Sequence, residues 1–147
     1  MRLASDLAGR LAEPPQAYAK LIEAESRLKR GRAREAIALA QEAHKRADTW
    51  LGRYVLGRAY LDAGAFTEAH SEFDACLRRR GEATAVFLDD VPSLRLLPPV
   101  YYYLGRAQEG LKSPRAAESF KTFLAMKEKS DGADPLVADA RRRMQGR

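Results

Sequence analysis

Small and apolar residues recur every three or four positions along most of the chain, with charged residues between them. This spacing is close to the helical period of about 3.6 residues and predicts amphipathic helices that each bury one face. The clearest example has Leu56 and Tyr60 on one predicted helix and Ala69 and Phe73 on the next, separated by Gly64. Over the whole chain, the pattern predicts about seven to nine helices and no β-sheet.

Parts of this pattern repeat along the sequence. Residues 31–36 align with residues 64–69 at a spacing of 33 residues, and the Leu-Gly-Arg-Ala sequence at 56–59 recurs at 104–107. Self-similarity at this spacing indicates stacked helix pairs. We therefore predict a single domain over residues 1–147 with three repeats and a capping helix at each end. The predicted ranges are 17–49, 50–82 and 98–130 for the repeats, 3–11 for a first capping helix that ends before Pro14 and Pro15, and 134–145 for a C-terminal capping helix.

The second repeat resembles the tetratricopeptide repeat (TPR), a helix pair with the pattern W-x2-L-G-x2-Y followed by A-x3-F. Arg53 stands in the Trp position and Gly81 in the terminal Pro position. The matching residues are Leu56, Gly57, Tyr60, Ala69 and Phe73. The resemblance, to TPR proteins of bacterial type, implies an all-α, right-handed superhelix of stacked antiparallel helix pairs with capping helices. In such a pair the small residues let the helices approach closely, and the aromatic residues fill the space around them.

The resemblance also implies a binding surface, because the first helix of each TPR pair lines a concave groove that holds peptides. The residues carried over to this groove as candidate ligand contacts are Tyr54, Arg58, Asp62, Tyr102, Arg106 and Glu109. The weakly matching first repeat places Tyr18, Leu21, Glu25, Leu28 and Lys29 at equivalent positions. A tyrosine one turn from an arginine suits recognition of a carboxylate or an extended peptide. Alternatively, Arg58 and Arg106 only pair with acidic side chains, for which Asp62 and Glu109 are available.

An insertion at about residues 82–99 separates the second and third repeats. It is more apolar than a solvent-exposed loop, so we expect it to pack on the rest of the molecule. Residues 94–99 are expected to be extended, because residues before proline avoid the helical region. Two placements are open. Either the insertion fills part of the groove, or it forms a local extra helix and leaves the groove open; the residues that would fill the groove are Phe87, Leu88, Leu94 and Leu97.

Composition offers little that could carry catalysis. The chain of 147 residues has one cysteine, Cys76, which excludes an internal disulfide and fits a cytoplasmic protein. The residues His70, Glu72, Asp74 and Cys76 lie close in sequence, but on one helix they point to different faces, so no metal site is expected. The sequence contains no glycine-rich phosphate loop and no nucleophile elbow. We therefore expect no enzymatic activity and no cofactor.

The net charge is +6, and the basic residues are mostly arginine spread across every segment, with runs at predicted helix ends at residues 78–80 and 141–143. Cations at a helix C-terminus are favoured by the helix dipole, so these runs are interpreted as solvated helix ends. Nucleic acid is disfavoured as a partner, because only Tyr101–Tyr103 with Arg95 and Arg106 combine aromatic and basic residues. No apolar run approaches the roughly 20 residues that span a membrane, and no membrane association is expected.

These features together predict a non-catalytic scaffold or adaptor. Its partner would be a protein or peptide, with an acidic or carboxylate group for the arginines of the groove. Two alternatives remain open. The chain could be a regulatory TPR segment of a larger bacterial signalling protein, or a module that assembles with further copies of itself into a homo-oligomer.

Overall fold

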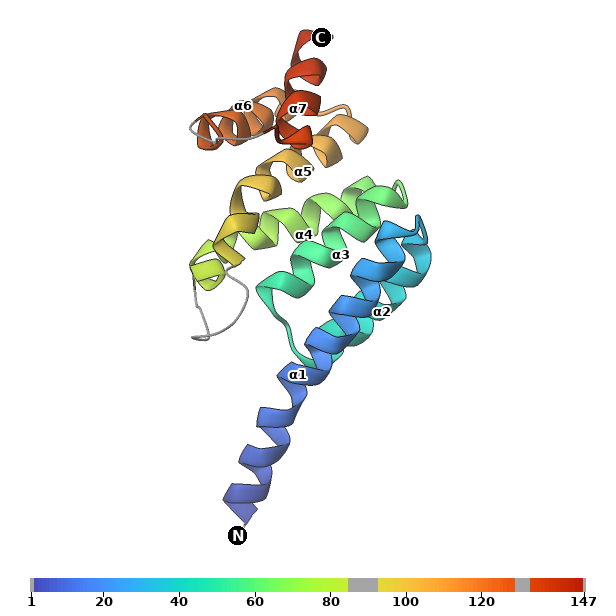
Figure 1. Cartoon of the computed structure of the whole chain (residues 1–147), viewed down its shortest axis with the longest axis vertical. Coiled ribbons are helices and arrows are strands. Elements are labelled where there is room, and N and C mark those ends of the chain that lie inside the picture. The colour runs from blue at the N-terminus through green and yellow to red at the C-terminus, as the bar shows by residue number, and fades with distance from the viewer. Residues whose placement is uncertain (1, 85–92, 129–132, 147) are drawn as a thin grey trace.

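The computed structural model describes the backbone of residues 2–84, 93–128 and 133–146, and the side chains of residues 16–82, 95–128 and 133–146. Within these ranges all regular structure is helical, as predicted, and no strand is present. The elements are α1 (Arg2–Lys29), α2 (Ala33–Arg46), α3 (Trp50–Asp62), α4 (Phe66–Arg78), the 3-10 turns η1 (Arg80–Thr84) and η2 (Ser93–Leu96), α5 (Leu97–Gly110), α6 (Ala116–Met126) and α7 (Pro135–Gln145). They are stacked in chain order along the long axis, so the two termini lie at opposite ends (Figure 1).

The helices pack as three pairs, α1 with α2, α3 with α4 and α5 with α6, and α7 follows on α6. The turn inside each pair has the same construction. A backbone N–H just after the first helix donates to a carbonyl five residues earlier: Arg32 to Arg27, Ala65 to Tyr60, and Ser113 to Gln108. This is the Schellman turn, which requires one residue in the left-handed conformation. That residue is Gly31 (φ +70°), Gly64 (φ +76°) and Lys112 (φ 54°) in the three turns.

In the second and third pairs, a glycine of the first helix packs against a phenylalanine of the second helix. A Cβ atom added to Gly57 in α3 would lie 2.8 Å from Cε1 of Phe73 in α4, and one added to Gly105 in α5 would lie 2.8 Å from Cε1 of Phe120 in α6. Both phenylalanines are completely buried. The close approach inferred from the repeat pattern is therefore present in both pairs.

Gly57→Ala is expected to lower the free energy of unfolding by about 1–3 kcal/mol, because the new methyl group would overpack the contact with Phe73. Alanine has the better helix propensity, by about 1 kcal/mol, so a stabilised variant would contradict this packing. Urea denaturation measures the difference. Gly81→Ala is the matched control, since an added Cβ there meets no described atom within 4 Å.

Two predictions about proline-containing segments are wrong. Pro14 and Pro15 do not end a helix, since α1 runs through them to Lys29 and its N-terminal part extends beyond the stack (Figure 1). Residues 94–99 are not extended, because residues 94–96 lie in η2 and Leu97 begins α5. Pro98 and Pro99 occupy the first turn of α5, where a missing N–H costs nothing.

The proposed placement of the insertion lies mostly outside the described residues. This applies to Phe87 and Leu88, and to the side chain of Leu94. Leu97 is described and packs, partly buried, against the core. Whether the insertion fills the groove or leaves it open therefore stays a prediction.

Candidate functional site

The first helices of the pairs line the concave face of the stack. Among the described residues, α1 contacts α3, α3 contacts α5 and α5 contacts α7, whereas direct contacts among α2, α4 and α6 are marginal at most. Because the first helices are closer together than the second helices, the stack curves toward them. We call the surface formed by α1, α3, α5 and α7 the concave face.

Arg58 of α3 is held in the wall of the concave face by three side chains. Its guanidinium carbon lies 5.6 Å from the ring centroid of Tyr54 and 5.5 Å from that of Tyr103, within the range of cation–π attraction. Its Nη1 donates to Oε1 of Glu25 at 2.6 Å. The expected partner, Asp62, is not the one used. Glu25 lies on α1, 33 residues before Arg58, which is the equivalent position of the preceding repeat.

Tyr54 is part of the core of the stack. It is 4% exposed, its ring is parallel to that of Trp50 at 6.0 Å between centroids, and its edge meets Tyr103 at 5.9 Å. Burial raises the pKa of both Tyr54 and Tyr103, so both hydroxyls stay neutral. Tyr54 therefore contacts Arg58 from the buried side and exposes little surface to a ligand.

The candidate residues of α5 lie against α7. The hydroxyl of Tyr102 donates to Oδ2 of Asp139 at 2.6 Å and accepts from Nη1 of Arg106 at 3.2 Å. Arg143 donates through Nε to Oδ2 of Asp139 at 2.5 Å and through Nη1 to Oε2 of Glu109 at 2.6 Å. Arg143 follows Glu109 by 34 residues, the usual TPR length, so α7 packs on α5 as the first helix of another pair would.

Two candidate residues, Asp62 of α3 and Arg106 of α5, retain free charge at the seam between these helices. Within the described ranges, neither has an oppositely charged partner within 4.0 Å. Asp62 is exposed. Partial burial by its surroundings raises the pKa of Asp62, while Arg58 and Arg106 act against that rise. Of the guanidinium donors of Arg106, one is used, by Tyr102. The α3–α5 seam thus offers one carboxylate and one largely free guanidinium on adjacent helices.

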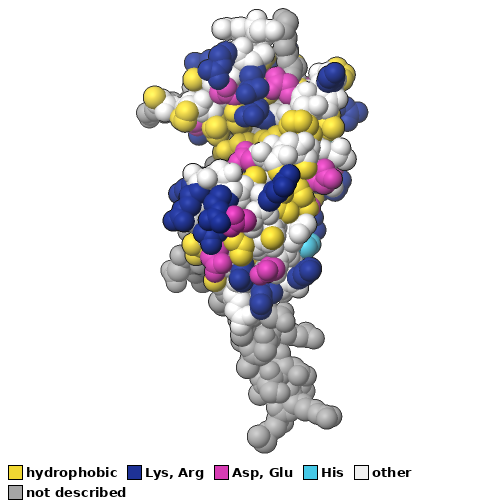
Figure 2. Space-filling view, turned by 90° about the vertical axis from the view of Figure 1, so that its right-hand side faces the viewer, with side chains coloured by type: hydrophobic (Ala, Val, Ile, Leu, Met, Phe, Trp, Pro, Cys, Tyr) yellow, Lys and Arg dark blue, Asp and Glu magenta, His cyan; other side chains and the backbone are white. Residues whose placement is uncertain are grey.

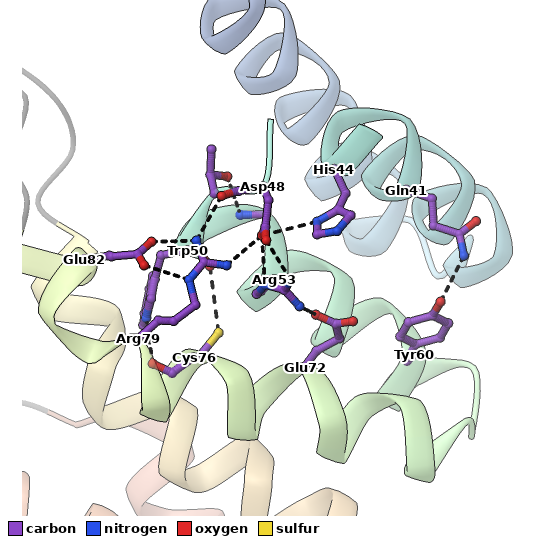
Figure 3. Close-up of polar contacts among 12 residues, drawn as sticks. Gln41, His44, Asp48, Trp50, Arg53, Tyr60, Glu72, Cys76, Arg79 and Glu82 are labelled. Atoms are coloured by element: carbon purple, nitrogen blue, oxygen red, sulfur yellow. Dashed lines mark hydrogen bonds and ion pairs between the residues drawn. The ribbon is translucent and has the colours of Figure 1, made fainter. Parts of the chain in front are cut away.

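A second polar cluster lies at the turn between α2 and α3 and has a structural role (Figure 3). Arg53 donates to both carboxylate oxygens of Asp48 at 2.8 and 2.7 Å and to Glu72 of α4 at 3.1 Å. Arg79, just after α4, donates to Asp48 at 2.7 Å and to Glu82. Hydrogen bonding from Arg53 above all lowers the pKa of Asp48 to about 2. Arg53, which stands in the Trp position of the repeat, therefore joins α3 to α4 through charge.

Three of the four residues considered as metal ligands, Glu72, Asp74 and Cys76, have other partners. Glu72 pairs with Arg53 and Asp74 with Arg78. Cys76 is buried, its Sγ donates to the carbonyl of Trp50 at 3.8 Å, and burial raises the pKa of its thiol to about 12. Among the described residues, no group of three or more histidine, cysteine, aspartate or glutamate side chains could hold a metal ion.

Positive and negative side chains are interspersed on the face of the stack drawn in Figure 2, with hydrophobic side chains between them.

Nothing in the described part of the chain forms a helix that is both long and apolar enough to span a membrane.

Sequence reasoning did not identify the partners of the candidate residues. These partners are Glu25 and Tyr103 for Arg58, and Asp139 and Arg143 for the α5 residues. The separations of 33 and 34 residues were the available signal, because side chains one repeat apart meet on adjacent first helices.

The comparisons with known proteins agree with this architecture. No protein-family model matches the sequence, and no curated protein matches it either. The crystal structure of a TPR-like protein from Chlorobium tepidum TLS is similar, with a TM-score of 0.77, 24% sequence identity, and coverage of 94% of this chain and 98% of that chain. The chain has a tetratricopeptide-like fold. The predicted fold class is thereby confirmed, while the number of repeats and a bacterial origin stay predictions.

Proposed function

We propose that the protein is a non-catalytic scaffold that binds an extended segment of a partner protein across the concave face, at the α3–α5 seam. The observation that carries this proposal is the pair of free charges at the seam, Asp62 and Arg106. The other charged candidates of α3 and α5 are already paired: Arg58 with Glu25, and Glu109 with Arg143.

The chemistry of the seam suits a segment with an acidic side chain or a C-terminal carboxylate. The Arg106 guanidinium presents a planar fork of donors that matches a carboxylate, and the hydroxyl of Tyr102 fixes its orientation. Asp62 can accept from a backbone N–H or a basic side chain of the same segment. A surface this short would bury less than a standard interface, so the expected Kd is roughly micromolar.

Self-association and nucleic acid binding receive less support. The exposed large hydrophobic side chains among the described residues are Ile22, Leu111 and Met126, which lie in three different parts of the stack and form no apolar patch. On the concave face α3, α5 and α7 each carry both an acidic and a basic side chain, and a nucleic acid needs one sign over a long track.

Arg106→Gln is expected to weaken binding of peptides selected on the wild-type protein by roughly tenfold or more, because a hydrogen bond between charged groups contributes about 1.5–3 kcal/mol. The peptides would come from a random display library, and Kd would be measured by fluorescence anisotropy. Arg141→Gln, which removes an exposed charge from α7, is the matched control. Equal affinity of the selected peptides for wild type and Arg106→Gln would reject the proposed site.

A further inference from the structure

The turn between α1 and α2 is rich in basic side chains. We call residues 27–35 the basic turn. It contains five basic side chains, Arg27, Lys29, Arg30, Arg32 and Arg34, against the single acid Glu35, and so has a net charge of +4. The whole chain of 147 residues has a net charge of +6. Five basic side chains thus gather at one edge of the stack.

Most of this charge is not neutralised within the molecule. Glu35 is shared by two arginines, since its Oε1 accepts from Nε of Arg32 at 2.6 Å and its Oε2 lies 3.4 Å from Nε of Arg27. Lys29, Arg30 and Arg34 are exposed, and their side chains have no hydrogen bond or ion pair within the described part of the chain. Like charges held this close repel one another and destabilise the folded state. A bound anionic group would relieve that repulsion.

The basic turn also borders a hollow in the surface. An open cavity of about 340 Å³ is lined by Gly31, Arg32, Ala33, Arg34, Glu35 and by Ala63, at the end of α3. Gly31 gives the turn its sharp direction through its positive φ of +70°. The first backbone N–H groups of α2 receive no side-chain cap, and the side chain of Arg32 at the N-cap position has no acceptor atom. The basic side chains, the cavity and the uncapped N–H groups of α2 thus lie together at this turn.

We propose that the basic turn is a second binding surface, separate from the α3–α5 seam, for a short acidic segment of a protein. The extent of the charge favours this partner over a nucleic acid. The corresponding turn of the next pair, between α3 and α4, is flanked by the acidic side chains of Asp62 and Glu68, so the positive track ends after one turn. The basic turn contains no aromatic residue on which a base could stack.

The proposal is tested by the binding of a fluorescein-labelled oligoglutamate peptide, followed by anisotropy, with an oligoserine peptide of equal length as the neutral probe. Wild type is expected to bind the acidic peptide and not the neutral one, with affinity that falls as salt is raised. Arg30→Ser/Arg34→Ser is expected to weaken binding by about tenfold, since each exposed ion pair contributes up to about 1 kcal/mol. Both residues are exposed, so circular dichroism should show an unchanged fold.

The matched control is Arg80→Ser/Lys121→Ser, which removes the same charge from exposed positions elsewhere on the stack. It is expected to bind the acidic peptide as wild type does, and an equal loss in this control would overturn the proposal. Arg106→Gln is also expected to bind it normally, which separates this surface from the α3–α5 seam. Tighter binding of single-stranded DNA than of the acidic peptide, with the same dependence on Arg30 and Arg34, would overturn the choice of partner.

Discussion

Phe73→Ala is expected to lower the free energy of unfolding by about 3–5 kcal/mol, which is enough to unfold a marginally stable domain. Phe73 is completely buried, its ring fills the space left by Gly57, and it stacks on Tyr103 at 5.8 Å between centroids. One side chain of α4 thus contacts both α3 and α5. Because two helix pairs meet at this ring, its loss leaves a cavity that neither pair can close alone. Urea denaturation followed by circular dichroism measures the change.

Ile22→Ala is the control for this experiment, because Ile22 is 72% exposed on α1. It is expected to change the free energy of unfolding by no more than about 0.5 kcal/mol. A Phe73→Ala variant as stable as the Ile22→Ala variant would mean that Phe73 does not link the pairs.

The helix pairs could be predicted from sequence because their packing depends on residue size at fixed spacing. Gly57 with Phe73 and Gly105 with Phe120 are close in sequence and obey one local rule, so the sequence predicts both contacts. The resemblance was strongest where this rule holds. It is weakest in the first repeat, where Glu23 and Arg27 stand in the positions of the packing residues Leu and Tyr.

The candidate site was harder to predict because its contacts cross between repeats. Arg58 could be placed on the first-helix surface, but its choice of Glu25 over Asp62 depends on how far α1 lies from α3. Tyr54 and Tyr102 occupy positions that face ligands in TPR proteins, yet they are only 4% and 3% exposed. Tyr54 packs on Trp50 and Tyr103, and Tyr102 packs on Phe120 and Phe123 of α6. Arg53, in the Trp position of the repeat, forms ion pairs with Asp48 and Glu72 that the repeat pattern does not predict.

The two arginines of the repeated Leu-Gly-Arg-Ala sequence have different roles in the structure. Arg58 and Arg106 are equivalent in sequence, but Arg58 is neutralised by Glu25 and enclosed by two tyrosines, whereas Arg106 bonds to a hydroxyl and keeps its charge available. The same position holds Glu25 in the first repeat, Arg58 in the second and Arg106 in the third. Arg58 therefore faces an acid on the preceding first helix, whereas Arg106 faces another cation, Arg58. A groove ligand is therefore expected to depend on Arg106, and Arg58 to contribute to stability.

Asp139→Ala is expected to release α7 from the concave face. Tyr102 is buried, and the substitution removes the acceptor of its hydroxyl together with a partner of Arg143, a loss of about 1–3 kcal/mol. The remaining contacts of α7 are the Arg143–Glu109 and Lys127–Asp134 ion pairs and apolar side chains of which only Ala140 is completely buried among those described. Hydrogen exchange of α7, read by mass spectrometry, should therefore quicken roughly tenfold or more, while exchange in α3 and α4 stays unchanged. Arg141→Ala, an exposed change on the same helix, should leave the exchange of α7 as it is.

The pH dependence of this variant gives an independent check on the same contact. Burial alone would raise the pKa of Asp139, but hydrogen bonds from Tyr102 and Arg143 outweigh it and lower the pKa to about 2 from its ordinary value of 3.8. A carboxylate whose pKa is lower in the folded state stabilises that state above the ordinary pKa and loses this effect as the pH falls through the folded value. The stability difference between wild type and Asp139→Ala should thus be full at pH 7 and shrink by on the order of 2 kcal/mol between pH 4 and pH 2. A difference that stays constant over this range would place the stabilising interaction of α7 elsewhere, and Tyr102 and Arg106 would then be free of α7 in the native protein.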